Sequence, residues 1–400
     1  MNKSIRAEQL IAACADDSRD AGIRILSELE PLAGAGSPVK PPVYEGGRYQ
    51  MDRRWETPGA DMPTEVVVLD QVPSQANRLE AAACLHRELV GLPEMRLDLS
   101  DLPLPPHLPR SISSWQFPHR NADAYLRDAT YEGEDFSRSP IGKSVLAATP
   151  SAAGSLVAWF PQALLFGFWQ SHLGKKQANT KHARAWVSEI IGWNPAATDT
   201  RVLGLKGDPL NLNTDEFMTF NQADQQQWEL GKKSAREEGQ KSDRLSEIGH
   251  GQVPFMRGAD GAPASVSFSR ISQTATISFA QLRRVSLGGP AGPAADAAAR
   301  ALLVGIGLFA HVFAFGRAFE LRSVADLRIA SRQVAFLGHG PDADEAIELP
   351  DQEGAVALLV SLREHAASEG VPLDGWGVAP LMLAPKKNLA AAIRATWSID

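Results

Sequence analysis

Apolar and polar positions alternate with two different periods in the first quarter of the chain. From Asp20 to Glu30 the alternation suffices for a strand with one buried face. The β-branched run Val66–Leu69 predicts a second strand. A helix then starts at Pro73 and Ser74, with Ser74 as its expected N-cap; its apolar side chains recur every three or four residues until Gly91. The segment MRLDL after it predicts a third strand.

The remainder of the chain predicts one further strand–helix–strand group together with additional helices and strands. The expected elements are a helix over Ala178–Ile191, a short strand over Arg201–Lys206, a hairpin over Ser265–Leu287 that turns near Ser272, a glycine loop LGGPAGP, an Ala-rich helix over 294–315, strands near Phe319–Arg322 and Asp326–Phe336, and an amphipathic helix over Ala355–Ala367 that ends at Gly370.

Four stretches interrupt these periodic segments. Residues 31–64 are rich in Gly and Pro and predict an insertion loop, and residues 100–155 predict a finger-like insertion. Residues 207–263 are polar and Gln-rich, which favours a projecting arm, and residues 338–400 form an acidic, helical end. Without these insertions the order is roughly β-α-β, then β-α-β. We therefore predict an α+β, ferredoxin-like (RRM-like) fold for one elaborated domain over residues 1–400.

Composition limits the possible surroundings of the chain. Hydrophobic residues make up 44% and charged residues 22%, as in an ordinary globular protein. Cys14 and Cys84 lack disulfide or zinc spacing, and the first residues do not follow a signal-peptide pattern, so we expect a cytoplasmic protein. The apolar run Ala301–Phe315 is shorter than a bilayer span and contains His311, so it predicts a buried core helix and no membrane contact.

The net charge of −7 argues against a polyanionic partner only at first sight. Residues 338–400 hold ten acids and four bases, and so carry −6 of that charge. The segment 175–186 holds only basic charges, on Lys175, Lys176, Lys181 and Arg184. Because phosphate contacts depend on local charge, such a stripe can bind RNA; the alternative is a solvated surface.

The sequence contains no complete catalytic motif of the kinds considered below. PIGKS, at 140–144, resembles the end of a phosphate-binding loop, but Ser137 stands where that loop requires glycine. The histidines form no metal-binding pair, and no G-x-S-x-G elbow occurs. Asp70 and Asp208 are isolated acids. We therefore predict no catalytic residue, no metal site and no cofactor.

The segment VPSQANRLE brings several hydrogen-bonding side chains into the first turn of the predicted helix. A helix N-terminus offers free N–H groups and a partial positive charge, which suits phosphate. Ser74, Gln75, Asn77 and Arg78 could contact RNA there. Alternatively, they cap the helix and pair with Glu80.

An ordered set of motifs in the chain resembles the Cas-seven kind of RAMP-superfamily backbone subunit in CRISPR type I-G (formerly I-U) effectors. The motifs are GRYQ (47–50), SQANRLE (74–80), SSWQFPHRNADAYLRD (113–128), FPQALLFGFWQSH (160–172), ARAWVSEIIGW (183–193), GDPL (207–210), LSEIGHGQVP (245–254), ISFAQLRRVSLG (277–288) and GRAFELRSVADL (316–327). Residues 1–19 and 338–400 lie outside the resemblance.

The resemblance implies a hand-shaped subunit with an RRM-like palm, finger-like insertions and a thumb, for which 207–263 is the candidate. Several copies would stack head-to-tail along a guide RNA (crRNA) as a helical ribonucleoprotein filament. That Cascade complex would pair the guide with target DNA in antiviral defence. The implied partners also include the large subunit and a fused Cas-five/Cas-six-type subunit, and this subunit binds without cutting.

The implied RNA contacts extend beyond the helix start. They are Arg48 and Gln50 in GRYQ, Arg120, the four cations Lys175, Lys176, Lys181 and Arg184, His250 in GHGQVP, and Arg283 and Arg284 beside the glycine loop. Phe160, Trp159 and Trp169 could stack on bases, although their apolar setting favours the core.

Two alternative functions stay open from sequence. One is a metal-dependent ribonuclease on the same scaffold, for which Asp70, Asp123 or Asp128 would supply the acid. The other is an assembly protein with no RNA role.

Overall fold

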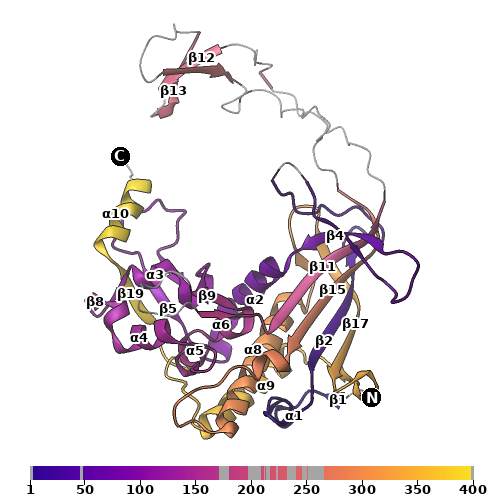
Figure 1. Ribbon diagram of the computed structural model, residues 1–400. Coiled ribbons are helices and arrows are strands. Elements are labelled where there is room, and N and C mark those ends of the chain that lie inside the picture. The colour runs from indigo at the N-terminus through magenta and orange to yellow at the C-terminus, as the bar shows by residue number, and fades with distance from the viewer. Residues whose placement is uncertain are drawn as a thin grey trace. The chain divides into compact units, whose positions relative to one another are not determined.

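The computed structural model describes residues 3–45, 48–170, 180–196, 209–210, 212, 217–221, 224–231, 240–245, 250 and 265–397. Its contacts divide the chain into two compact units. Unit 1 comprises Met1–Pro41, Met51–Pro195 and Ser267–Asp400, and unit 2 comprises Pro42–Gln50 and Ala196–Val266. Figure 1 shows the elements of both units along the chain.

A nine-stranded sheet forms the framework of unit 1. Its strands, in spatial order, are β1 (Lys3–Ser4), β18 (Glu345–Glu348), β17 (Asp326–Leu337), β2 (Gly22–Pro31), β15 (Phe268–Ser278), β11 (Trp186–Pro195), β4 (Thr64–Asp70) and β3 (Met51–Arg54), with β16 (Phe319–Glu320) paired to β17. Only β1 and β18 pair in parallel.

The centre of this sheet has the predicted ferredoxin-like arrangement. In chain order, β2 leads to helix α2 (Val72–His86), then to the neighbouring strands β11 and β15, then to helix α8 (Pro293–Phe315) and β17. In space these strands lie in the order β17-β2-β15-β11, and all their pairs are antiparallel. The α+β, RRM-like fold class is therefore confirmed, with β4 and β3 added at one side.

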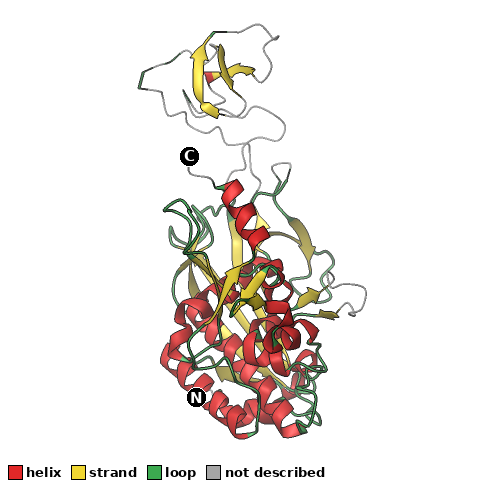
Figure 2. Cartoon of the chain, turned by 90° about the vertical axis from the view of Figure 1, so that its left-hand side faces the viewer, coloured by secondary structure: helices red, strands yellow, loops and turns green. Residues whose placement is uncertain are grey.

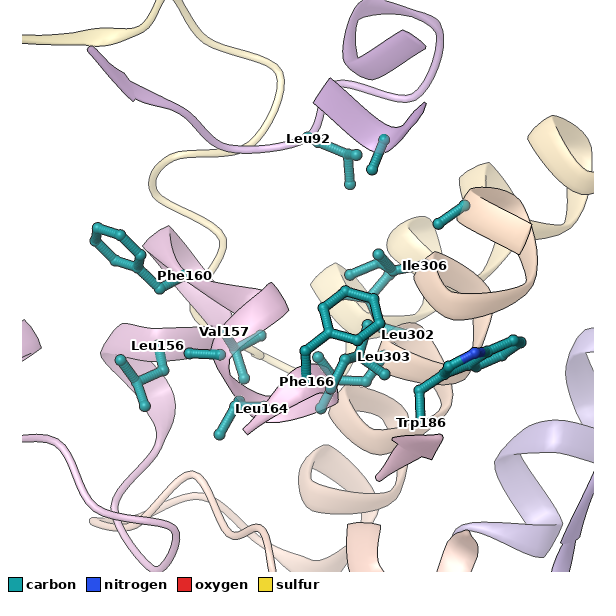
Figure 3. Close-up of a cluster of buried hydrophobic side chains, with 14 of the residues drawn as sticks. Leu92, Leu156, Val157, Phe160, Leu164, Phe166, Trp186, Leu302, Leu303 and Ile306 are labelled. Atoms are coloured by element: carbon teal, nitrogen blue, oxygen red, sulfur yellow. The ribbon is translucent and has the colours of Figure 1, made fainter. Parts of the chain in front are cut away.

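Helices cover one face of this sheet (Figures 1 and 2). They are α1 (Ala7–Ala13), α2, α8 and α9 (Gln352–Ser368). Helix α8 lies in the centre of the core, where apolar side chains from several segments meet (Figure 3). Its length and hydropathy would suit a membrane span, but its side chains are buried within the protein. The expected buried helix is thus confirmed.

Glycine allows close packing at the middle of α8. A Cβ on Gly307 would lie 2.5 Å from the Trp186 ring, and one on Gly305 would lie 2.7 Å from Leu362 of α9. Both distances are too short for a side chain. The absence of Cβ atoms at these positions therefore lets β11 and α9 pack directly against α8.

A second sheet of five short strands lies beside these helices in unit 1. Its order is β6 (Ser111–Ser113), β5 (Met95–Asp98), β19 (Leu381–Pro385), β7 (Ala129–Tyr131) and β8 (Glu134–Asp135). Short helices surround it: α3 (Ala124–Arg127), α4 (Pro140–Ala147), α5 (Gly154–Trp159), α6 (Pro161–Phe166) and α10 (Lys387–Thr396). Residues 100–155, expected to have little regular structure, thus build a small subdomain together with strand β19 from near the C-terminus.

Unit 2 contains a separate three-stranded sheet. Its order is β13 (Asp224–Leu230), β12 (Phe217–Asn221) and β14 (Gln240–Arg244). Met218 and Leu245 are buried and Trp228 packs against them. The arm predicted at 207–263 falls within this unit, and its role as a thumb stays a prediction.

Two predicted elements are wrong. The helix expected over 178–191 is strand β10 (Thr180–His182) followed by β11, because buried and exposed residues alternate from Trp186 to Ile190. The hairpin expected around Ser272 is the single strand β15, followed by α7 (Phe279–Leu282). The residues around Ser272 contain no Gly, Pro, Asn or Asp that would favour a turn.

The other predicted elements agree better with the structure. Helix α9 ends at Ser368, and Gly370 has a φ of +76°. The acidic segment 338–400 contains α9 and α10, as expected, but also β18 and β19. The strand predicted over Arg201–Lys206 lies outside the described residues.

Candidate nucleic-acid interface

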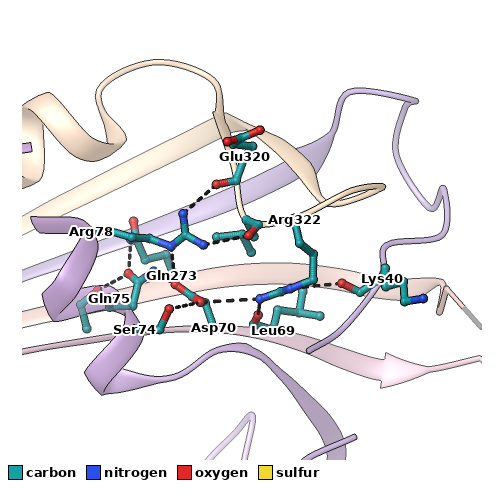
Figure 4. A network of polar contacts seen from close by, with 11 residues as sticks. Lys40, Leu69, Asp70, Ser74, Gln75, Arg78, Gln273, Glu320 and Arg322 are labelled. Atoms are coloured by element: carbon teal, nitrogen blue, oxygen red, sulfur yellow. Dashed lines mark hydrogen bonds and ion pairs between the residues drawn. The ribbon is translucent and has the colours of Figure 1, made fainter. Parts of the chain in front are cut away.

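Asp70, at the end of β4, organises the start of α2 (Figure 4). Its buried carboxylate accepts hydrogen bonds from Ser74 Oγ at 2.7 Å, from Gln75 Nε2 at 2.5 Å and from Arg78 Nε at 3.0 Å. A buried carboxylate is costly unless it is paired and hydrogen-bonded. The helix begins at Val72, so Ser74 is inside its first turn and bonds to Asp70 instead of capping the helix.

The carbonyl oxygen of the Gln75 side-chain amide also forms hydrogen bonds inside the protein. Its Oε1 atom accepts hydrogen bonds from Ser188 Oγ on β11 and from Gln273 Nε2 on β15, the latter at 2.8 Å. Gln75 is 0% exposed. Its side chain therefore links α2 to the sheet and has no surface to present to RNA.

Arg78 joins the same network to the segment that precedes β17. Its Nη1 and Nη2 atoms donate to the carbonyl oxygens of Glu320 and Leu321, each at 2.9 Å. Arg322 reaches back and donates to the Leu69 carbonyl at 2.9 Å. Figure 4 shows both guanidinium groups in these positions. The geometry gives Arg78 a structural role between α2 and this segment.

Asn77 differs from its neighbours because it is exposed on α2. Ser74 and Arg78 are half-buried. RNA contact by Ser74, Asn77 or Arg78 stays a prediction.

Arg120 forms a buried ion pair with Glu80 of α2. Its Nε and Nη2 atoms donate to the two carboxylate oxygens at 2.7 and 2.8 Å, and its Nη1 atom donates to the Gly167 carbonyl at 2.9 Å. Arg120 has a φ of +53°, an unusual conformation for a residue other than glycine. Burial raises the pKa of Glu80, and the hydrogen bonds from Arg120 oppose that rise.

A groove of about 570 Å³ opens beside this ion pair. We call it the β9–β10 groove, after strands β9 (Phe168–Gln170) and β10, which form one wall. Its other walls come from the start of α2, the turn around Arg120 and the start of β11. The lining residues are Val72, Pro118, His119, Arg120, Phe166, Gly167, Phe168, Trp169, Lys181, His182, Ala183, Arg184 and Val187.

The lining of the groove is basic. It includes Lys181, Arg184 and Arg120 but no Asp or Glu. Lys181 and Arg184 are exposed, whereas Arg120 is held by Glu80. Burial and the neighbouring charge of Arg120 lower the pKa of Arg184. Arginine nevertheless keeps its charge at neutral pH, so the groove attracts anions.

Val187 of β11 contributes the sheet face away from the helices to the lining of the groove. Trp186 is buried and packs against Gly307 of α8. Because successive strand residues point to opposite faces, Val187 points away from α8, and it is 39% exposed. A ligand in the groove would contact that outer face of the sheet.

Only part of the predicted basic stripe can be placed. Lys181 and Arg184 lie together at the groove, while Lys175 and Lys176 lie outside the described residues. RNA binding by any of the four stays a prediction.

The neighbouring residues Arg283 and Arg284 lie in different surroundings. Arg283 donates to the carbonyl oxygens of Ala13 at 3.2 Å and Asp20 at 3.0 Å, which links α7 to the N-terminal segment. Arg284 is exposed and could meet a ligand or a neighbouring copy.

Three predicted contacts belong to unit 2. Arg48 is exposed and forms an isolated bridge with Tyr44, and Gln50 is also exposed. His250 is exposed, with its ring 5.6 Å from that of Trp228.

Trp169 is the feature that the sequence interpretation placed wrongly. Phe160 and Trp159 are buried, as their apolar setting suggested, but Trp169 is 66% exposed and lines the groove. The signal was present in the alternation of Phe168, Trp169 and Gln170, which a strand places on opposite faces.

The aspartates considered for ribonuclease chemistry do not gather at one place. Asp70 is buried in the α2 network, and Asp123 accepts bonds from the backbone N–H groups of Tyr125 and His119, both at 2.9 Å. Asp128 lies at the end of α3. Among the described residues, no group of three or more His, Cys, Asp or Glu side chains could hold a metal ion.

Comparison with known families gives one match. Residues 23–196 match the family described as CRISPR-associated protein GSU0053. The matched stretch contains β2, β4, α2 and every residue of the β9–β10 groove. A search of curated proteins found no match. The family match supports a CRISPR-associated protein that works with other CRISPR components in defence.

Proposed function

We propose that this chain is a guide-RNA-binding backbone subunit of a CRISPR type I-G effector, of the RAMP superfamily. The β9–β10 groove carries the proposal, because it presents two exposed cations and an exposed aromatic ring and has no Asp or Glu among its described lining residues. The RRM-like core and the CRISPR-associated family match support it independently.

Binding of this kind must tolerate any guide sequence. Lys181 and Arg184 would contact phosphates, which every RNA shares. Affinity would then depend on salt more than on sequence. The net charge of −7 does not oppose this, because the groove is locally basic.

The wider arrangement follows from this role. Several copies would bind one crRNA head-to-tail, leaving bases free to pair with target DNA in the cytoplasm of a prokaryote. The other Cascade subunits, including the large subunit and a fused Cas-five/Cas-six-type subunit, would join this filament. Unit 2, which contains the 207–263 arm, would serve as the thumb.

The test measures binding of the full-length protein to two single-stranded RNAs of unrelated sequence over a range of salt. The double variant Lys181→Ala/Arg184→Ala should weaken both RNAs alike and reduce the slope of log affinity against log salt by about 1.4, because each phosphate contact contributes about 0.7. Lys387→Ala/Arg394→Ala on α10 removes two exposed cations elsewhere in unit 1 and serves as control. Absence of RNA binding by the wild type, even at low salt, would overturn the proposal.

A second measurement tests the proposal that the subunit binds without cutting. The protein is incubated with its guide, a complementary RNA and Mg²⁺. The complementary strand should stay intact. Cleavage that is lost in Asp123→Asn or Asp128→Asn would instead support a ribonuclease.

A further inference from the structure

Trp169 occupies an unusual position for a tryptophan. It lies between the buried residues Phe168 and Gln170, yet 66% of its surface is exposed. Lys181 is its direct partner across the antiparallel β9–β10 pair. Directly opposed residues on such a pair have side chains on the same face. The indole and the ammonium group therefore stand together on one wall of the groove.

We infer that the β9–β10 groove binds one unpaired nucleotide of single-stranded RNA, with its base stacked on Trp169 and its phosphate at Arg184 and Lys181. This inference rests on the proposed function and adds the class of RNA that the site selects. A base has an apolar face whatever its identity, so stacking adds affinity without reading sequence.

The composition of the groove fits both parts of a nucleotide. Trp169, Val72 and Val187 provide apolar surface for a base, and Lys181 and Arg184 provide charge for a phosphate. The volume of about 570 Å³ falls in the usual range for sites that enclose a small organic group. Among the described residues, Arg184 donates no hydrogen bond and so keeps its donors for a ligand, whereas Arg120 is committed to Glu80 and Gly167.

A paired nucleotide would not satisfy this site. In a duplex both faces of each base are covered by its neighbours, and the indole would have no ring to stack on. The groove should therefore distinguish single-stranded RNA from double-stranded RNA, which cations alone would not do.

Photocrosslinking locates the base directly. The full-length protein is bound to a single-stranded oligouridine RNA that carries 5-iodouridine, irradiated, digested and analysed by mass spectrometry. We expect a crosslink at Trp169. The crosslink should persist in Trp169→Phe and disappear in Trp169→Ala.

Affinity measurements separate stacking from charge. Trp169→Ala should weaken binding of the oligouridine about tenfold or more, but leave unchanged the affinity for an abasic ribose-phosphate strand of equal length. Trp397→Ala, which removes another partly exposed tryptophan at the end of α10, is the matched control. It should change neither affinity.

The outcomes distinguish this inference from the proposed function. If the wild type binds RNA but Trp169→Ala affects neither crosslinking nor affinity, the nucleotide site is overturned and RNA binding stands. A duplex that binds as tightly as the single strand would also overturn it, as would a crosslink that forms only with single-stranded DNA. If the wild type binds no RNA, the proposed function itself fails.

Discussion

His311 lies fully buried near the C-terminal end of α8, and among the described residues neither of its ring nitrogens has a hydrogen-bond partner. Its ring lies 5.7 Å from that of Trp186 and 5.5 Å from that of Phe315. Burial, together with the nearby charge of Arg332, lowers the pKa of His311 to about 3. The imidazole is therefore neutral in the folded protein.

Folding stability should consequently fall in acid. Between pH 6.5 and about 3 the unfolded chain binds a proton at His311 while the folded protein does not. Above pH 6.5 His311 therefore does not reduce the free energy of unfolding, and below pH 6.5 that free energy decreases as the pH falls. His311→Leu removes this decrease. Relative to wild type, the variant should gain about 1.4 kcal/mol in free energy of unfolding per pH unit below 6.

Denaturant unfolding at several pH values between 7 and 4 provides the measurement. His339→Leu changes an exposed histidine and serves as control. Parallel pH profiles for wild type and His311→Leu would contradict the assignment.

Removing one partner of the Arg120–Glu80 pair should destabilise the protein more than removing both. Arg120→Met leaves the Glu80 carboxylate buried without its partner and should cost about 3–5 kcal/mol of stability. Adding Glu80→Gln removes the orphaned charge, so the double variant should recover much of that loss. Thermal or denaturant unfolding of Arg120→Met, Glu80→Gln and the double variant measures this coupling, and simple additivity of the two single changes would contradict it.

Arg78 should matter for the stability of the fold. Arg78→Ala removes a partner of buried Asp70 and frees two carbonyl oxygens, which should cost on the order of 2–3 kcal/mol. The exposed neighbour Asn77→Ala should change stability by less than about 0.5 kcal/mol. RNA affinity of the folded Arg78→Ala protein tests the predicted RNA contact of Arg78 separately from its role in folding. A uniform loss of affinity for unrelated RNAs would place Arg78 at the RNA.

The residues of the α2 network and of the groove are only partly predictable from the sequence. The cluster of polar residues at the start of α2 was found, but its partners Gln273 and Arg322 lie about 200 residues or more away in the chain. No local pattern indicates that such side chains meet. Lys181 and Arg184 were found from charge alone, and the groove that joins them to Trp169 depends on the fold.

Strands with both faces covered are the elements that local periodicity describes least well. Trp186–Ile191 has apolar residues spaced as in a helix, because β11 buries the consecutive residues Ile190 and Ile191 as well as Trp186. The helices α2, α8 and α9 were predicted closely, since each has a long apolar stripe and an identifiable end. The short elements of 100–155 combine local contacts, such as the β7–β8 pair, with contacts to the distant strand β19 that no local pattern indicates.

The turn between α6 and β9 requires glycine for two separate reasons. Gly167 has a φ of +80°, and a Cβ there would lie 2.8 Å from the His182 carbonyl oxygen on β10. Gly167→Ala should therefore displace β10 and weaken RNA binding, at a cost on the order of 1–3 kcal/mol. Gly133→Ala provides a control, because Gly133 has a similar φ of +82° but no atom within 4 Å. Unfolding curves of both variants should show the larger loss for Gly167→Ala; equal losses would show that the contact with β10 is unimportant.

The complete molecule should assemble on RNA in steps. If copies bind head-to-tail along one strand, the mass of the complex should increase by one subunit at regular increments of RNA length. Native mass spectrometry with a series of single-stranded RNAs measures this. Complexes whose mass is independent of RNA length, or equal assembly after nuclease treatment, would favour a structural protein with no RNA role.

The overall topology was predictable because β2, α2, α8 and β17 each carry a clear pattern and follow the ferredoxin-like order. The division into two units and the position of the C-terminal strand were not. Residues 338–400 stood out by their charge, whereas the contacts of β19 depend on residues about 285 positions earlier.

Because β19 lies between β5 and β7, the second sheet can be completed only late in the synthesis of the chain. The ribosome makes β5 and β7 long before residue 381. In the nascent chain, the edge of each strand that later pairs with β19 is therefore unpaired. Strand β19 can enter between them only after residues 381–385 have left the ribosome. Translation that stops early would leave a chain with its ferredoxin-like strands intact and an open edge prone to aggregation.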